Sequence, residues 1–276
     1  MKMKFALAGA LLSAVTLPAY ASTLFASDYL TSSTKLYTAN QSTGALTAIG
    51  ATARNVGDLA SNATTLFGIT LGGNNLVTID PTTGAILTSV AVTGTRSGDI
   101  TSLAFNTLTN TLYGNTTTGF GSTSGDGLYS INVATGVASF IGSIGFTNVY
   151  ALATDTTGAL FGISDASREF VRISSATGAG TLISSIGTGG WFDMAARPED
   201  NVMFLSDAFG RTLHTINTTT GATTLVGPYG AASNIAGLAF LGGAVPEPST
   251  WGMMLFGFGL VGSVLRRRRA LATAIA

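Results

Sequence analysis

Oxygen-bearing side chains recur at matched positions of the sequence, and their chemistry is that of a calcium site. A leucine or methionine recurs in five repeats; asparagine or aspartate stands four residues before it in four of them and one residue before it in two. Calcium prefers such hard oxygen ligands. If the repeats surround an axis, we predict that these side chains lie together around one opening of the central channel and bind the ion there. The alternative is that each one only caps the turn leading into its strand. The side chains are Asn55, Asp58, Asp99, Asn148, Asp193 and Asn234.

Residues that could catalyse a reaction are few. His214 is the only histidine, and we expect it to be a half-exposed strand residue and not a general base. Sugar cleavage needs two carboxyl groups about 5 to 9 Å apart, and Asp58 with Asp193 is the pair to consider, although nothing in the sequence shows that they meet. Nucleophile-elbow, zinc-protease and Walker motifs are absent. Cysteine is absent too, which excludes disulfides, zinc–cysteine sites and thiol nucleophiles.

Five repeats must position these side chains. Each combines a strand carrying Leu-Ala, a second with Leu-aromatic-Gly, a third ending in a turn with Thr-Gly, and a fourth that runs toward Ile-Gly. A period of about 45 residues with four short strands is typical of a β-propeller blade. No stretch between the two ends of the chain has a sustained helical period, so we predict an all-β propeller of about five four-stranded blades. The turn glycines are Gly44, Gly84, Gly136, Gly178 and Gly221, spaced by 40, 52, 42 and 43 residues.

The turns before these glycines contain an aspartate or asparagine, as at Asp80, Asn132 and Asn217. Such a side chain caps the backbone just ahead of it, and glycine takes the positive φ that closes the hairpin. We therefore interpret these residues as hinges of a sheet and not as ligands. The glycine-rich segment 119–127 is an insertion in the third repeat, and we expect it to form the lip of a binding face.

The two ends of the repeat region predict how the ring closes. The first repeat begins at residues 23–26 with a match to a second strand, so its innermost strand is missing. Residues 235–240, after the last repeat, match the innermost strands of the others. We therefore predict that residues 238–240 pair with residues 24–27, which would hide two open sheet edges.

Three physically different signals follow one another near the carboxyl end. Pro246 and Pro248 fix their own φ angles and hold Glu247 in an extended, readable segment. Residues 251–265 are uncharged and span roughly 22 Å as a helix, which is short for a hydrocarbon core of about 30 Å. We predict a single transmembrane helix that either thins the bilayer or borrows length from its flanks. A basic block follows this helix and keeps the carboxyl end of the chain in the cytoplasm. It consists of Arg266, Arg267, Arg268 and Arg269.

This order of signals resembles the PEP-CTERM sorting tail of exported Gram-negative proteins, over residues 245–276. The resemblance implies that an integral-membrane exosortase recognises Pro-Glu-Pro and processes the chain. It also implies a link to exopolysaccharide and biofilm production, which are commonly associated with carriers of this tail. The chain departs from the family by continuing through residues 270–276 after the arginines. An ordinary single-span anchor is the alternative.

The amino end has the pattern of a secretory signal peptide. Lys2 and Lys4 precede an apolar run over residues 5–17, and Ala19 and Ala21 form a cleavage site ahead of Ser22. We predict a signal helix over residues 1–21 that the secretion machinery removes; the alternative is an amino-terminal anchor. The remaining propeller domain, residues 22–244, is expected to be exported, held briefly at the inner membrane and then delivered to the cell surface.

The charge of this domain excludes one class of partner. Residues 22–244 contain twelve acidic and seven basic side chains, so the domain is mildly acidic although the whole chain sums to zero. Nucleic acid is therefore not an expected partner, because no basic face is available to neutralise phosphates.

Three functions compete, since a propeller fold does not choose among them. The favoured one is a non-enzymatic protein of the extracellular matrix that binds exopolysaccharide or forms part of the matrix, with no cofactor. The second is a calcium-dependent enzyme of lactonase or polysaccharide-lyase type, in which the channel acids hold the metal. The third is a scaffold for protein interaction, which an exposed apolar patch would favour.

Overall fold

The computed structural model describes residues 22–29, 34–117, 126–165, 167–187, 189–230 and 234–242. The predicted signal peptide, the sorting tail with its predicted membrane helix, and residues 118–125 of the glycine-rich loop lie outside these residues. The described residues form twenty strands and contain no helix. Accordingly, none of them belongs to a helix long and apolar enough to cross a membrane.

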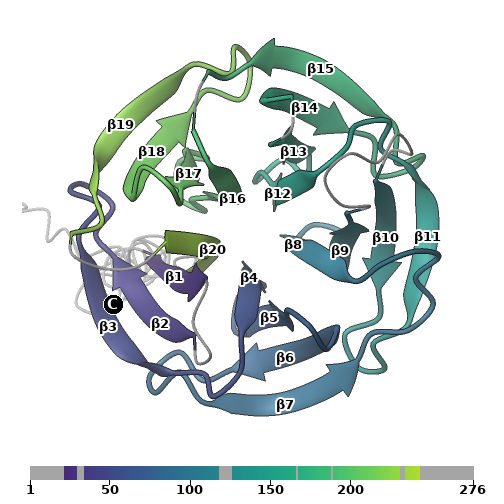
Figure 1. Cartoon of the computed structure of the whole chain (residues 1–276), viewed down its shortest axis with the longest axis horizontal. Coiled ribbons are helices and arrows are strands. Elements are labelled where there is room, and N and C mark those ends of the chain that lie inside the picture. Colours follow the sequence, from purple (N-terminus) through teal and green to yellow (C-terminus); the bar gives the residue numbers. More distant parts are fainter. Residues whose placement is uncertain are drawn as a thin grey trace, which may run out of the picture. The chain divides into compact units, whose positions relative to one another are not determined.

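The strands form five four-stranded antiparallel sheets arranged as blades around an axis (Figure 1). Blade 1 contains β20 (Asn234–Leu241), β1 (Thr23–Tyr29), β2 (Lys35–Ala39) and β3 (Leu46–Ala51). Blade 2 contains β4 (Val56–Ser61), β5 (Leu66–Thr70), β6 (Asn75–Ile79) and β7 (Ile86–Ala91). Blade 3 contains β8 (Ile100–Asn106), β9 (Thr111–Thr116), β10 (Gly127–Ile131) and β11 (Ala138–Ser143). Blade 4 contains β12 (Val149–Thr154), β13 (Leu160–Ser164), β14 (Glu169–Ile173) and β15 (Gly180–Ser185). Blade 5 contains β16 (Trp191–Ala196), β17 (Met203–Asp207), β18 (Thr212–Ile216) and β19 (Thr223–Pro228). The prediction of an all-β propeller with five four-stranded blades is confirmed.

The innermost strands β4, β8, β12, β16 and β20 surround the axis in that order (Figure 1). We call the face at which these strands begin the start face, and the face at which they end the end face. The hydrophobic core lies between neighbouring blades and not at one centre. Phe67 of blade 2, for example, stacks on Phe105 of blade 3 with ring centroids 5.7 Å apart. The outer strands β7 and β15 contain only exposed and half-buried residues, because their outer face meets solvent.

The glycine of each Leu-aromatic-Gly strand has a packing reason. In β5, a methyl group added at Gly68 would approach Cγ1 of Val56 to 2.7 Å and Cδ1 of Ile79 to 3.1 Å. Gly114 of β9 is crowded in the same way by Ile100 and Ile131. The middle of blades 2 and 3 therefore accepts large apolar neighbours because the second strand has no side chain at this place.

The repeated turns behave as predicted. The Oδ1 atom of Asp80 accepts hydrogen bonds from the backbone N–H and the hydroxyl of Thr82 at 2.8 and 2.6 Å, and these bonds lower the pKa of Asp80. Gly84 closes the turn with φ of 76°. A methyl group at Gly84 would lie 3.1 Å from backbone atoms of Gly50 in blade 1. These turns are therefore hinges that also let neighbouring blades approach closely on the end face.

The predicted closure is confirmed. β20 pairs with β1 in antiparallel register, with Leu24 opposite Phe240 and Ala26 opposite Leu238. Residues from the two ends of the repeat region thus complete blade 1. Because Thr23 lies opposite Leu241, the chain enters and leaves the propeller side by side on the end face.

Candidate functional site

Two of the predicted site residues meet in the central channel. Asp58 of β4 and Asp193 of β16 are 1% and 0% exposed, and their carboxyl groups are hydrogen-bonded to each other. Asp58 also accepts hydrogen bonds from the backbone N–H of Leu59 at 2.6 Å and from that of Leu103 at 2.8 Å. Asp58 therefore links the inner strands of blades 2 and 3, and its bond to Asp193 adds blade 5.

Asp193 forms the same kind of bonds between blade 5, to which it belongs, and blade 1. Its Oδ1 accepts from the backbone N–H of Met194 at 2.7 Å, and its Oδ2 accepts from that of Leu238 at 2.5 Å. Blade 1 lies between the two acids and carries Gly237 at the equivalent position. A methyl group at Gly237 would collide with the hydroxyl of Ser27 and lie 2.9 Å from the backbone nitrogen of Leu59. Position 237 therefore has no room for a side chain between Ser27 of blade 1 and Leu59 of blade 2.

Burial controls the protonation of this pair. Loss of hydration raises the pKa of Asp58 to about 8, against the lowering effect of its hydrogen bonds from Asp193, Leu103 and Leu59. Burial, followed by the charge of Asp58, raises the pKa of Asp193 well above its usual range. Two buried carboxylates in contact cannot both ionise at neutral pH, so the pair retains a proton. The hydrogen-bonded pair fastens blades 2, 3, 5 and 1 around the axis.

The other predicted calcium ligands lie at a different level of the channel. Asn55, Asn148 and Asn234 are at the start face, three residues before the acid-pair position of their own strands, which is roughly 10 Å along an extended chain. Asn55 accepts a hydrogen bond from Thr34 at 3.2 Å, and Asn234 accepts one from Arg211 at 3.4 Å.

The remaining two candidates differ from each other. Asn148 has a positive φ of 53°, and its buried Oδ1 has no hydrogen-bond partner, whereas Asp99 is exposed in the loop between β7 and β8. Within the described residues no three acidic or imidazole side chains gather as metal ligands would. The structure thus separates the six residues into an acid pair and a set at the start face, and calcium binding stays a prediction.

His214 is a half-buried residue of β18. Its ring lies edge-on to Trp191 at 5.2 Å, and its Nε2 is 2.9 Å from the hydroxyl of Thr212. Burial lowers the pKa of His214 below its usual value. These contacts support the interpretation of His214 as a strand residue.

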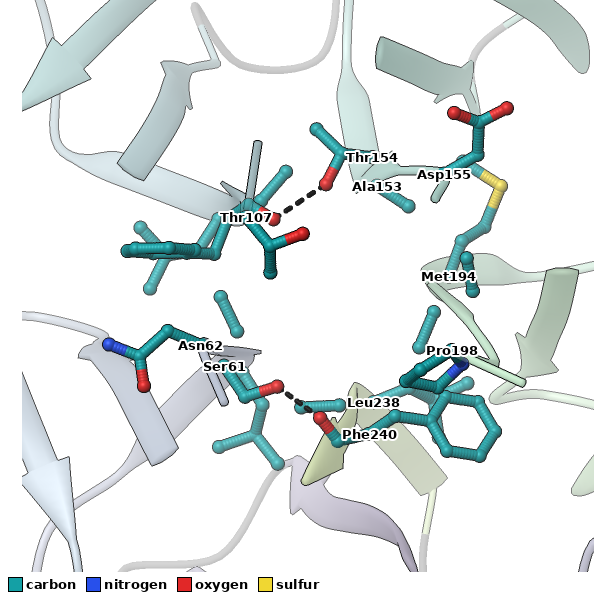
Figure 2. Close-up of a pocket in the computed structure, with 18 of the residues that line it drawn as sticks. Ser61, Asn62, Thr107, Ala153, Thr154, Asp155, Met194, Pro198, Leu238 and Phe240 are labelled. Carbon is teal, nitrogen blue, oxygen red and sulfur yellow. Dashed lines mark hydrogen bonds between the residues drawn. The ribbon is translucent and has the colours of Figure 1, made fainter. Parts of the chain in front are cut away.

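A funnel opens at the end face, with a volume of ≈ 190 Å³ (Figure 2). The hydroxyl groups at its rim are hydrogen-bonded within the propeller. That of Thr154 donates to the carbonyl of Phe105 at 2.6 Å, and that of Ser61 donates to the carbonyl of Phe240. Among the described residues that line the funnel, Asp155 is the one ionisable side chain, and it caps the turn at Thr157 at 2.9 Å. The floor is apolar, and neither Asp58 nor Asp193 lines the funnel. The floor is made by Leu59, Leu103, Leu152, Met194 and Leu238.

An aromatic row lies at the start face, and the sequence reasoning missed it. The rings of Tyr150 and Phe192 stack with centroids 5.7 Å apart, and Phe192 meets Phe209 edge-on at 5.3 Å. Tyr150 and Phe192 are half-buried second residues of β12 and β16, whereas Phe209, in the turn after β17, is 65% exposed. The signal that could have found the row is that Tyr150 and Phe192 occupy the same position in adjacent repeats.

Comparison with known families decides the nature of the carboxyl end. A family model described as the PEP-CTERM protein-sorting motif matches residues 244–269. The chain carries a PEP-CTERM sorting motif. The motif implies exosortase-dependent sorting of an exported protein that transits the membrane. It covers Pro246, Glu247 and Pro248 together with the arginine block, as the sequence resemblance predicted.

The propeller body is compared through its fold. No curated protein matches the PEP-CTERM chain. A chain in the crystal structure of a nidogen/laminin complex matches with a TM-score of 0.53 and 8% identity, over 79% of this chain and 97% of that one. A protein of unknown function from Bacteroides thetaiotaomicron matches with a TM-score of 0.46 and 14% identity, over 75% and 65% of the two chains. One from Bacteroides caccae matches with a TM-score of 0.45 and 11% identity, over 74% and 72%. At these identities the first likeness shows a shared fold alone.

Proposed function

We propose that this PEP-CTERM protein is an exported, non-enzymatic matrix protein that binds a polysaccharide at the aromatic row. The observation that carries the proposal is the contact series from Tyr150 through Phe192 to Phe209. In this proposal the signal peptide is removed ahead of Ser22, and exosortase processing then delivers the propeller to the cell surface.

The aromatic row has the chemistry that a sugar chain requires. One face of a pyranose ring presents C–H groups and packs on an aromatic ring, while its hydroxyl rim seeks hydrogen bonds. Phe209 offers an exposed ring beside the half-buried Phe192. The turn of Phe209 also carries the exposed Arg211, whose side chain donates to Asn234 and supplies a polar edge beside the ring.

The position of the row also suits a sorted protein. Residues 22 and 242 lie at the end face, where β1 begins and β20 ends, whereas the row lies at the start face. A ligand on the row therefore does not compete for space with the segments through which the chain enters and leaves the propeller.

The buried acids support a structural role over a catalytic one. A catalytic carboxyl group must come within hydrogen-bond reach of its substrate. Asp58 and Asp193 are almost fully buried, and their oxygens are hydrogen-bonded to backbone N–H groups. We therefore assign them to ring closure and not to sugar cleavage.

Removing an aromatic ring tests the proposed binding site. We expect Phe209→Ala to weaken polysaccharide binding about tenfold, the change that a loss of about 1.4 kcal/mol produces. Binding of the wild type and the variant to a glycan array, followed by titration with the best glycan, measures this change. Leu225→Ala is the matched control, because Leu225 is 59% exposed on the outer strand β19. Equal affinity of the wild type and Phe209→Ala would argue against the row.

Changing the sorting motif tests delivery separately. We expect replacement of Pro246, Glu247 and Pro248 by alanine to abolish surface delivery in a host that has an exosortase, because the extended motif is lost. Cell fractionation and the length of the retained chain measure the effect. The control replaces Ser249 and Thr250 by alanine. Unchanged surface delivery of the motif variant would refute exosortase sorting.

A further inference from the structure

Ser22 is held by a carboxylate at the seam where the ring closes. Its backbone nitrogen donates to Oε1 of Glu199, and its hydroxyl donates to Oε2 of the same residue at 2.8 Å. Its carbonyl accepts a hydrogen bond from the side-chain amide of Gln41 at 2.7 Å. Ser22 immediately precedes β1 of blade 1, and Glu199 lies in the loop between β16 and β17 of blade 5, so these bonds join two neighbouring blades.

The adjacent Arg197 forms its ion pair with Asp200 and acts on Glu199 only through its charge. Arg197 donates to both carboxylate oxygens of Asp200 at 2.8 and 2.6 Å, and its third nitrogen donates to Gln41 at 2.8 Å. Across the described ranges, Arg197 with Asp200 is the one salt bridge. Glu199 thus receives two donors from Ser22 but forms no ion pair.

We propose that Glu199 is the binding site for the α-ammonium group of the exported chain. Cleavage ahead of Ser22 converts its neutral amide N–H, which already points at the Glu199 carboxylate, into a positively charged group at the same place. The new ion pair fastens blade 1 to blade 5 on the end face, next to the pairing of β1 with β20. Processing therefore makes the closed ring more stable than it is in the precursor. This inference rests on removal of the signal peptide ahead of Ser22, which belongs to the proposed function.

Two forms of the propeller that differ only at the amino end test the site. Residues 22–244 contain every described strand and hydrophobic cluster, and residues 21–244 group as one compact unit, so we expect this part to fold without the rest of the chain. One form starts at Ser22 after proteolytic removal of a fusion partner. The other starts at Ala19 and keeps a neutral amide at Ser22. We expect the first form to melt about 2–4 °C higher, the shift that about 1 kcal/mol produces in a domain of this size.

Variants of the two glutamates identify the partner. In Glu199→Gln the two forms should melt at the same temperature, whereas in Glu169→Gln, on β14 of blade 4, the difference should persist. Amine-reactive labelling gives a second measurement. The α-amine at Ser22 should react several-fold more slowly in the wild type than in Glu199→Gln, relative to the exposed Lys35, the sole lysine of residues 22–244.

Two results would overturn the proposal. One is an equal melting temperature of the two forms in the wild type, and the other is a difference that survives Glu199→Gln. Neither measurement involves a glycan or the sorting tail, so a failure here is distinct from a failure of polysaccharide binding or of exosortase sorting. Amino-terminal sequencing of the full-length protein exported by its host checks the premise, because a first residue other than Ser22 also refutes the proposal.

Discussion

A chain that ends after Pro228, and so lacks β20, is expected not to fold. β20 is the inner strand of blade 1, yet it comes from the carboxyl end of the repeat region. Its Ile235, Leu238 and Phe240 are 0–5% exposed, and burying such side chains contributes about 1.5–3 kcal/mol each. The sum is comparable to the whole stability of a typical domain, about 5–15 kcal/mol. Circular dichroism and size-exclusion chromatography of the truncated chain measure the loss.

The control keeps the strand and removes the tail. A chain ending at Ala244 should give a cooperative melting transition, because every pairing of β20 with β1 is retained. A synthetic peptide of residues 229–244 added to the truncated chain should restore part of the folded population, since the open edges of β1 and the neighbouring inner strands accept it. A truncated chain that melts like the control would show that closure by β20 is not needed.

The stability of the propeller is expected to fall as the pH rises from about 4 to about 8. The ordinary pKa of an aspartate, 3.8, applies to the unfolded chain, and burial raises the pKa of Asp58 to about 8 in the folded one. Between these values the folded chain holds a proton that the unfolded chain has released. The contribution of the pair is therefore fully present below pH 3.8 and declines by about 1.4 kcal/mol for each pH unit and each retained proton, levelling off above the folded pKa. Urea unfolding at pH 5 and at pH 8 measures the decline.

Replacing both acids isolates their contribution. In Asp58→Asn with Asp193→Asn neither side chain titrates, so the decline assigned to the pair should disappear. The variant should be less stable than the wild type at pH 5, because each asparagine offers one acceptor oxygen to two backbone N–H groups. Other groups also titrate: burial raises the pKa of Asp165 and lowers that of His214. The difference between the two profiles cancels these effects, and parallel profiles would contradict the assignment.

Most of the fold could be predicted from the sequence because each blade is encoded locally. A turn needs an asparagine or aspartate and a glycine within six residues, as at Asp80 and Gly84. The register of closure could be predicted because a strand missing at one end matched an extra strand at the other. The sorting tail is a linear motif, so its order of residues was sufficient.

The sites were predicted less completely. The sequence marks Asp58 and Asp193 as a pair to consider, but their hydrogen bond joins strands of blades 2 and 5 that are 135 residues apart, so only the closed ring shows it. The aromatic row could be recognised only from the distance between the rings of Tyr150 and Phe192, because the same repeat position holds different residues in different blades. The contact of Ser22 with Glu199 spans 177 residues and belongs to no repeat.

The sequence by itself determined the blade, its turns, the closing strand and the sorting motif, because these depend on neighbouring residues and on a regular period. Only the tertiary structure decided which side chains share the axis, which rings stack on the start face and which carboxylate holds Ser22. These contacts depend on side chains that differ between five similar blades. The blades bring them together around one axis only once the ring has closed.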